Sequence, residues 1–217
     1  MSLKSSIRTI VTLGKGVVQG IPAAAADRDP LELFGEWFEA AKDSGIFLPE
    51  SMALATASSE GTPSVRMILL KAVDERGFVF YTNYESRKGS ELESNARAAL
   101  CFHWAVLERQ VRVEGRVERV SGEESKAYFA TRPRGSRIGA WASRQSEPLS
   151  SREVLEERVR RFGREHAGDD VPLPPFWGGY LLRPERIEFW QGKADRLHER
   201  LVFQREDGVW KTVRLYP

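Results

Sequence analysis

The first patterned part of the chain is a helix followed by a series of short strands. Asp29 and Pro30 provide an N-cap residue and a first-turn proline. Phe34, Trp37 and Phe38 then follow at helical spacing on one face. Beyond residue 50 the pattern changes to the two-residue period of strands, interrupted by turn residues. Strands are predicted over five ranges: 53–57, 64–73, 78–82, 98–104 and 110–120.

The second half of the chain returns to helices before it ends in strands. The last of these helices is expected to open with Ser150 and Glu153 as a capping box. Short consecutive strands with tight connections favour antiparallel pairing. Strands and helices do not alternate along the chain as they do in a parallel α/β sheet. The predicted fold class is α+β with mainly β structure: an antiparallel, barrel-like sheet with flanking helices. The predicted ranges are helices 122–131, 136–142 and 150–166, and strands 178–191, 201–205 and 209–215.

Length and composition fit one domain with an N-terminal extension. The chain has 217 residues and 41% hydrophobic content, enough for one substantial core. Residues 1–28 contain a short apolar run and an alanine run without clear periodicity. The apolar run is too short to span a membrane. We expect a flexible arm over residues 1–28 and a single domain over 29–217.

Charge and cysteine content narrow the class of protein. Lysine and arginine number 33 against 31 acidic residues, so no overall field favours nucleic acid or a membrane surface as a partner. The single cysteine, Cys101, excludes an internal disulfide, and the three histidines show no metal-ligand spacing. We expect a cytoplasmic protein that has no metal site and binds neither nucleic acid nor membrane.

One candidate anion site follows a predicted strand. Ser86 is a candidate N-cap, and Arg87 and Lys88 come next, in the first helical turn, where the helix dipole disfavours cations. A bound phosphate would resolve this conflict, because free N–H groups and both side chains would converge on it. A solvent-exposed basic turn is an equally open interpretation.

A second candidate anion site begins at Tyr128. Arg132 and Ser136 lie around a Pro-x-Gly loop that leads into a helix. A phenol, guanidiniums and a hydroxyl therefore surround a second phosphate cradle. Neither segment contains a Walker or dinucleotide glycine motif. Two separate anion sites would suit two phosphorylated ligands.

The segment 190–200 gathers an indole, two guanidiniums and an imidazole near a glycine. The groups belong to Trp190, Arg196, His198 and Arg200. Such a set is suited to a flat, anionic ligand. For His198, a hydrogen bond at a strand end is the structural alternative.

Two predicted strands supply further candidates. Arg66 and Lys71 lie at the ends of an apolar run, where strict alternation places them on opposite faces, and snorkelling is the alternative. The Gln110 amide could donate to and accept from the edge of a heterocycle. For Arg112 and Glu114, cross-strand ion pairs are the more favoured interpretation.

Taken together, these segments resemble the pyridoxamine 5′-phosphate oxidase family. The resemblance implies an FMN-binding split β-barrel, Greek-key-like in topology, whose C-terminal region serves dimerisation and the substrate. It also implies a homodimer with flavin at the subunit interface. The matching residues run in order along the chain: 66–71, 80–83, 86–88, 108–111, 128–129, 132–133, 138–141, 145–146, 177–179, 188–192 and 196–198.

The resemblance implies roles for individual residues as well. Arg87 and Lys88 would hold the FMN phosphate, while Arg196 and His198 would lie beside the substrate's pyridine ring as candidate catalytic residues. Implied FMN contacts are Arg66, Lys71, Tyr81, Thr82, Arg87, Lys88, Gln110, Gln145, Ser146, Trp190 and Arg200. Implied substrate contacts are Lys71, Tyr128, Arg132, Ser136, Arg196 and His198.

The implied reaction belongs to vitamin B6 metabolism. Pyridoxamine or pyridoxine 5′-phosphate would be oxidised to pyridoxal 5′-phosphate by hydride transfer to flavin N5. O₂ would then be reduced to hydrogen peroxide, and the amine would yield ammonia.

Two alternatives stay open. One is a related FMN oxidase of phenazine biosynthesis that acts on a reduced tricyclic carboxylic acid. Tyr128, Arg132 and Ser136 argue against it, because that substrate has no phosphate. The other is a split-barrel protein that only binds flavin or haem, which residues 196–198 disfavour.

The chain also departs from the family pattern. The residues before Asp29 lack the basic, tyrosine-containing segment that covers the substrate in many members, so a lid is doubtful. Glu199 stands where aspartate is common and keeps the charge. Arg137 stands where glutamine is frequent and adds a cation near the substrate phosphate.

Overall fold

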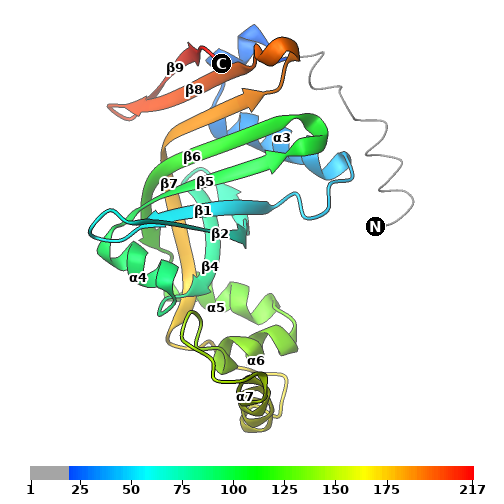
Figure 1. Cartoon of the computed structure of the whole chain (residues 1–217), viewed down its shortest axis with the longest axis vertical. Coiled ribbons are helices and arrows are strands. Elements are labelled where there is room, and N and C mark those ends of the chain that lie inside the picture. The colour runs from blue at the N-terminus through cyan, green and yellow to red at the C-terminus, as the bar shows by residue number, and fades with distance from the viewer. Residues whose placement is uncertain (1–19) are drawn as a thin grey trace.

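One strongly curved antiparallel sheet dominates the fold (Figure 1). The computed structural model describes residues 20–217. The predicted mainly β, antiparallel class is confirmed. The strands in this part of the chain are β1 (Ser51–Ala57), β2 (Pro63–Leu69), β3 (Ala72–Asp74), β4 (Gly77–Asn83), β5 (Arg97–Trp104), β6 (Arg109–Arg119), β7 (Trp177–Gln191), β8 (Glu199–Glu206) and β9 (Val209–Leu215).

The long strand β7 connects the two ends of the sheet. The main path runs β2-β1-β5-β6-β7-β4-β3, and β8 pairs with both β7 and β9. The first residues of β7 pair with β4, where Gly179 lies opposite Tyr81. Its last residues pair with β8, where Trp190 lies opposite Arg200. Strand β6 pairs along most of β7, and the register shifts by one residue between Glu114 and Gly115.

One predicted strand, 64–73, is two strands in the structure. β2 ends at Leu69 and pairs with β1, whereas β3 begins at Ala72 and pairs with β4 at the opposite end of the strand order. Between them, Leu70 N donates to the Glu50 carbonyl oxygen and Lys71 N donates to that of Val79. The apolar run therefore passes from one edge of the sheet to the other.

Two helices pack directly on the sheet. Helix α3 (Pro30–Asp43) begins after Asp29, whose carboxylate accepts two first-turn N–H groups, as predicted. Phe34 and Trp37 of this helix are buried in the main core. Helix α4 (Arg87–Ser94) is capped by the Ser86 side chain, as predicted, and contacts β1.

The other helices form a lobe of their own, at the foot of Figure 1. They are α5 (Gly122–Thr131), α6 (Arg134–Ala142) and α7 (Arg152–Glu165). Phe129 and Trp177 belong to their separate apolar core. Helix α7 follows Ser151, whose side chain makes no capping hydrogen bond, so the predicted capping box at Ser150 is wrong. No helix between residues 20 and 217 is long and apolar enough to cross a membrane.

The N-terminal end of the described chain lies against the sheet. Ala23–Asp27 forms a short 3-10 helix, and Ile21 is buried in the main core. The Ile21 N–H donates to the Glu199 carboxylate at 2.6 Å. The predicted 28-residue flexible arm is therefore too long at its C-terminal end. Residues 1–19 lie outside the described residues.

Candidate active site

A pocket of about 520 Å³ lies where the sheet meets the helical lobe. Strands β2 and β4 and helices α5 and α6 supply most of its wall. Nine of the sixteen predicted site residues line it, and we call them the pocket group. They are Arg66, Lys71, Tyr81, Thr82, Lys88, Tyr128, Arg132, Ser136 and Gln145.

Arg66 and Lys71 line the same pocket, although strict alternation places them on opposite faces. The break between β2 and β3 lies between the two residues, at Leu70. The chain changes pairing partner there, so the alternation of β2 does not continue to Lys71. From the sequence pattern, a shared ligand requires a bulge, a strong twist or a ligand that wraps an edge, and the structure has a strand break between the two residues.

Glu91 anchors two of the arginines. Its buried carboxylate accepts hydrogen bonds from Arg87 Nε at 2.9 Å and Ser64 Oγ at 2.6 Å, and Arg66 Nη2 lies 3.2 Å away. The Thr56 hydroxyl donates to it as well. Burial acts to raise the pKa of Glu91, but the hydrogen bonds outweigh burial and lower that pKa to about 2. Glu91 is not among the predicted residues; its only sequence signal is its position four residues after Arg87.

Lys88 is the buried cation of the pocket group. Its Nζ donates to Gln145 Oε1 at 2.7 Å and lies 3.2 Å from the hydroxyl oxygens of Thr82 and Ser86. Burial, together with the positive charge of Arg66, lowers the pKa of Lys88 to about 8. A bound anion would therefore stabilise its charged form.

Three aromatic rings stack on the helical side of the pocket. The ring centroids of Tyr81 and Tyr128 lie 3.9 Å apart with an interplanar angle of 14°, and that of Trp177 lies 5.6 Å from Tyr81. Burial raises the pKa of Tyr81 to about 12 and raises that of Tyr128 as well. Both phenols therefore stay protonated and keep a hydrogen-bond donor at neutral pH.

Arg132 carries an unused donor in this pocket. Its guanidinium carbon lies 4.6 Å from the Trp177 ring centroid, a cation–π contact. Burial lowers the pKa of Arg132. Its Nη1 is buried without a hydrogen-bond partner in residues 20–217. An unpaired buried guanidinium nitrogen is costly unless an anion completes it, so Arg132 points to an anionic ligand.

Arg87 and Ser146 lie at the rim and do not line the pocket. The Arg87 N–H donates to Ser146 Oγ at 3.2 Å, and the Arg87 side chain is 61% exposed. Ser146 has a φ of 76°, in the left-handed region that side chains rarely adopt. The turn brings its hydroxyl to the first N–H of α4, where an anion would also bind.

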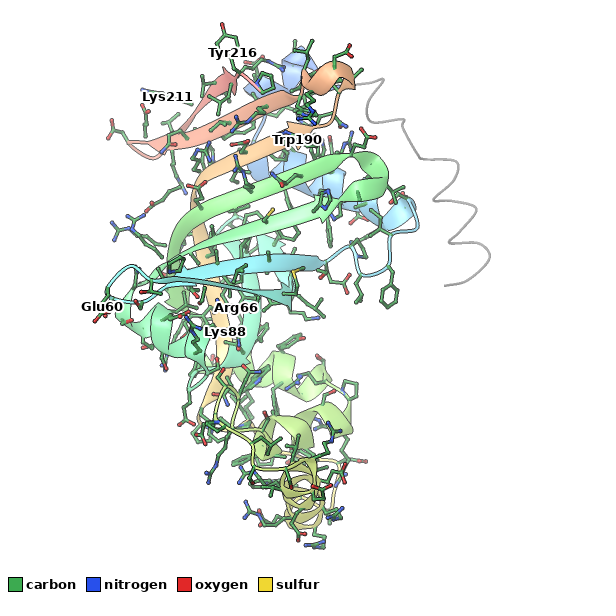
Figure 2. The ribbon with its side chains drawn as sticks, viewed as in Figure 1. Glu60, Arg66, Lys88, Trp190, Lys211 and Tyr216 are labelled. Carbon is green, nitrogen blue, oxygen red and sulfur yellow. The ribbon has the colours of Figure 1, made fainter. Side chains whose placement is uncertain are left out.

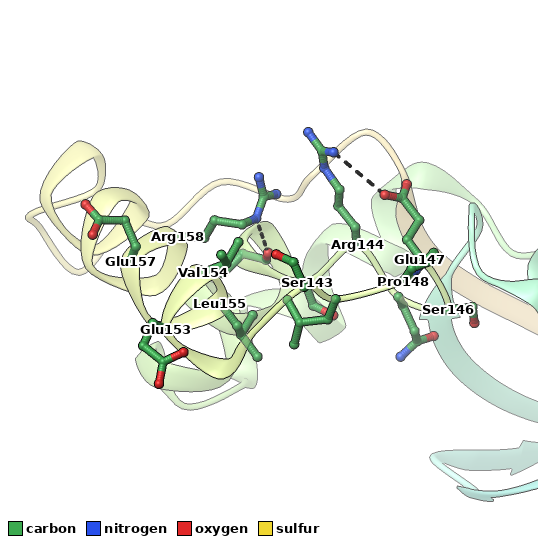
Figure 3. A pocket seen from close by; sticks show the side chains of 14 residues that line it. Ser143, Arg144, Ser146, Glu147, Pro148, Glu153, Val154, Leu155, Glu157 and Arg158 are labelled. Atoms are coloured by element: carbon green, nitrogen blue, oxygen red, sulfur yellow. Dashed lines mark hydrogen bonds and ion pairs between the residues drawn. The ribbon is translucent and has the colours of Figure 1, made fainter.

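A larger cavity, of about 750 Å³, lies between α7 and the loop that precedes it (Figure 3). Arg158 Nε donates to the Ala142 carbonyl oxygen at 2.6 Å, and Arg144 lies 3.7 Å from Glu147. These polar groups are engaged with each other within the wall. Only two predicted site residues border this cavity, so the predicted chemistry belongs to the smaller pocket.

The remaining predicted residues gather near the far end of β7, and we call them the strand-end group. They are Gln110, Trp190, Arg196, His198 and Arg200. Gln110 pairs with Trp190 across β6 and β7, and Trp190 pairs with Arg200 across β7 and β8. The centroid of the His198 ring lies 4.5 Å from that of Trp190.

The two groups lie at different ends of one protomer. In Figure 2, Trp190 lies near β8, whereas Arg66 and Lys88 lie toward the helical lobe. Along β7, Gly179, opposite the pocket residue Tyr81, and Trp190 are eleven positions apart. That separation corresponds to about 35 Å of strand at about 3.3 Å per residue. The two groups therefore lie near opposite ends of β7 in one protomer.

Arg200 is held by the buried carboxylate of Glu188, which belongs to the matching segment 188–192 but is not among the predicted site residues. Arg200 Nε donates to Glu188 Oε1 at 2.8 Å, and Arg112 and Arg186 also contact Glu188. Burial acts to raise the pKa of Glu188, but Arg200 and Arg112 lower it to about 2. Glu114 pairs with Arg186 at 2.8 Å. The predicted cross-strand ion pairs of Arg112 and Glu114 are confirmed.

The loop between β7 and β8 carries the two candidate catalytic residues. Asp195 and Arg196 have φ values of 55° and 61°, uncommon backbone conformations of the kind that functional sites often contain. His198 Nδ1 accepts the Lys193 N–H at 3.2 Å. In the neutral ring this contact places the proton on Nε2. The predicted structural alternative for His198, a hydrogen bond beside a strand end, is thus present.

Two family models match most of the chain. Residues 39–164 match the model described as pyridoxamine 5′-phosphate oxidase. Residues 177–217 match the model described as the pyridoxine 5′-phosphate oxidase C-terminal dimerisation region. The chain belongs to the pyridoxamine 5′-phosphate oxidase family. The resemblance seen in the sequence is confirmed, and the dimerisation region contains four of the five residues of the strand-end group.

Similar proteins carry the same family name. A pyridoxine/pyridoxamine 5′-phosphate oxidase of Psychromonas ingrahamii is 56% identical over 217 residues, 100% of both chains. One of Rubrobacter xylanophilus is 60% identical over 198 residues, 91% of each chain. The crystal structure of PhzG from Burkholderia lata 383, in complex with tetrahydrophenazine-1-carboxylic acid, has a TM-score of 0.86 at 32% identity. It covers 93% of this chain and 100% of that one. The predicted split-barrel fold is confirmed.

Proposed function

We propose that this protein is an FMN-dependent oxidase that converts pyridoxamine and pyridoxine 5′-phosphates to pyridoxal 5′-phosphate, with O₂ as acceptor. The observation that carries the proposal is the presence of two anion-binding features in one pocket. One is buried Lys88 with its lowered pKa, and the other is Arg132 with its unpartnered Nη1. A flavin mononucleotide and a phosphorylated vitamin would supply one phosphate each.

The residues present fit the phosphate of FMN. Arg66, Arg87 and Lys88 bring three cations together, and Glu91 balances only one of them. The remaining positive charge suits a phosphate dianion, and charge-assisted hydrogen bonds would hold it. Thr82, which lies beside the Lys88 ammonium group, would add a neutral donor.

We propose that FMN lies between two copies of the chain. Because the pocket group and the strand-end group lie near opposite ends of β7 in one protomer, we expect a second protomer to bring its Gln110, Trp190 and Arg200 to the pocket. The match of residues 177–217 to a dimerisation region supports this arrangement. A ring bound there would lie between the two subunits.

Within this site the chain's residues bind and align the substrate. Lys71, Tyr128, Arg132 and Ser136 would bind its phosphate, and Arg196 and His198 of the other protomer would flank its pyridine ring. The chemistry supplied by bound FMN is acceptance of a hydride and delivery of the electrons to O₂. Oxidation of the amine consumes one O₂ and one water and releases ammonia and hydrogen peroxide.

His198 would orient the substrate or handle one of its protons. The contact of its Nδ1 with the Lys193 N–H fixes the ring and directs Nε2 away from the loop backbone. A strong general base is not needed for hydride transfer, so its role is alignment first.

The phenazine oxidase remains the second candidate. PhzG binds a tricyclic acid in its crystal structure and is 32% identical to this chain, well below the 56% and 60% of the relatives named as pyridoxine/pyridoxamine 5′-phosphate oxidases. The buried, unpartnered Nη1 of Arg132 favours a phosphorylated substrate.

The test is a reduction experiment on the purified protein. Its flavin absorbance should bleach without oxygen when pyridoxine or pyridoxamine 5′-phosphate is added, and hydrogen peroxide should form when air returns. A yellow protein that stays inert with both vitamers, or that bleaches only with a reduced tricyclic acid, would contradict the proposal.

A further inference from the structure

Glu188 lies near the C-terminal end of β7, outside the set of residues proposed to contact a ligand. Its side chain is fully buried and is surrounded by three arginines, Arg112, Arg186 and Arg200. It lies two residues before Trp190 and on the same face of the sheet. Burying a charged carboxylate carries a high desolvation penalty. Only well-oriented ion pairs and hydrogen bonds from its partners can offset that penalty.

Arg200 is the partner that Glu188 orients most completely. Its Nε and Nη2 donate to the two carboxylate oxygens at 2.8 and 3.2 Å, a side-on bidentate pair. Its Nη1 donates to the carbonyl oxygen of Tyr216 at 3.0 Å. Three of its five N–H groups thus donate hydrogen bonds, two to Glu188 and one to Tyr216. Because the two acceptors lie on different sides of the guanidinium, they fix its plane.

The other two arginines differ from Arg200. Arg186 divides its guanidinium between Glu188 at 2.9 Å and Glu114 at 2.8 Å. Arg112 contacts Glu188 through one Nη only. Neither is among the residues proposed to contact FMN, whereas Arg200 is. The carboxylate therefore has one functional partner and two that balance charge.

We propose that Glu188 is a positioning residue that presents Arg200 to the flavin of the assembled dimer, and that its negative charge performs this task. The proposal rests on the proposed function, because Arg200 needs a flavin to contact. A purely structural Glu188 would hold β6, β7 and β8 together and would affect FMN only through lost stability.

The experiment measures FMN affinity and fold stability separately. FMN is titrated into full-length apoprotein with flavin fluorescence as the signal, and unfolding is followed in urea. Glu188→Gln should raise the FMN Kd by about tenfold or more, the effect of losing a charge-assisted hydrogen bond. Arg186→Gln is the matched control: it breaks an ion pair of the same carboxylate and should lower stability while changing the Kd by less than about twofold.

A double-mutant cycle tests whether Glu188 acts through Arg200. In an Arg200→Lys background, Glu188→Gln should change the FMN Kd by less than about twofold, because the residue it positions is gone. The proposal is overturned if Glu188→Gln has the same effect with or without Arg200. Equal Kd increases in Glu188→Gln and Arg186→Gln would also overturn it.

A second variant covers the case in which Glu188→Gln does not fold. Glu188→Asp keeps the charge but withdraws it from Arg200, so the FMN Kd should rise by clearly less than about tenfold. An increase of about tenfold or more would overturn the proposal, because the charge would then not perform the task. Wild-type protein that binds no FMN would instead reject the proposed function, before any variant is compared.

Discussion

The pocket group and the strand-end group hold their cations in different ways. In the pocket, Lys88 has a pKa lowered to about 8, and Arg132 keeps a buried nitrogen without a partner in the described chain. At the strand end, Arg200 has three N–H groups engaged, and Glu188 balances it. The pocket is thus incomplete until an anion arrives, whereas the strand end is already ordered in one protomer. We therefore expect the phosphates to bind in the pocket, at Lys88 and Arg132, and the strand end to align a ring through the ordered Arg200.

Each region is nevertheless built on one buried carboxylate. The Glu91 carboxylate accepts hydrogen bonds from hydroxyls as well as from arginines, all within one corner of the pocket. Glu188 has arginines alone, and these come from three different strands. Removing Glu91 should therefore disturb one corner of the pocket, and removing Glu188 should loosen three strands.

The largest expected effect comes from Glu91→Ala. The substitution leaves the half-buried Arg66 without its carboxylate and removes the charged acceptor of the Thr56 and Ser64 hydroxyls, so the free energy of unfolding of the apoprotein should fall by about 3 kcal/mol. Urea denaturation measures it. Glu185→Ala is the control, because Glu185 also pairs with two arginines, Arg97 and Arg116, but its side chain is 39% exposed, against 8% for Glu91. In Glu185→Ala the free energy of unfolding should fall by less than about 1 kcal/mol. Similar decreases in both variants would show that burial of the Glu91 network does not affect stability.

The next largest expected effect comes from variants that distinguish the two phosphate sites. Arg132→Ala should raise the KM for pyridoxine 5′-phosphate by about 10- to 100-fold while the FMN Kd changes little, because a buried charge-assisted contact is lost. Arg87→Ala should raise the FMN Kd by about tenfold and leave the KM nearly unchanged. Steady-state kinetics at saturating FMN and a fluorescence titration give the two constants. Equal effects on both ligands in either variant would argue against two separate phosphate sites.

The smallest expected effect is a pH dependence that sets the two regions apart. The pKa of Lys88 lies at about 8 in the fold and at 10.5 ordinarily, so between these values the unfolded chain binds more protons and stability rises with pH. FMN binding has the opposite sign, because phosphate binds the ammonium form. The FMN Kd should therefore increase above pH 8 by up to about tenfold per pH unit.

The measurement is an FMN titration from pH 7 to about pH 9.5. Lys88→Met is the matched variant: its FMN affinity should be low and nearly independent of pH in that window. Arg200→Lys, at the strand end, should keep the wild-type slope. A slope that survives in Lys88→Met would assign the titration to another group.

Local patterns in the sequence predict much of this fold. Helix α5 over residues 122–131 and strand β9 over 209–215 match the predicted ranges, because capping residues, turns and alternation are local signals. The split of 64–73 into β2 and β3 has no local signal. Both parts are apolar, and the break arises because they pair with different strands.

The same reasoning separates the predictable part of the site from the rest. The Ser86 N-cap with Arg87 and Lys88 follows from neighbouring residues and lies where the sequence places it. The networks of Glu91 and Glu188 join residues up to 35 and 76 positions apart. Such contacts depend on the completed sheet, so spacing along the chain does not reveal them.

The position of β7 also sets the order in which the molecule can assemble. Phe78 of β4 pairs with Leu182 of β7, 104 positions further along the chain, and β6 finds its partner in β7 as well. Until residues 177–191 have left the ribosome, β4 and β6 lack the strand that joins them. Non-local pairing of this kind slows folding and exposes sheet edges meanwhile. The half-made sheet, with its unpaired strand edges, is the stage at which a nascent chain most needs protection from aggregation.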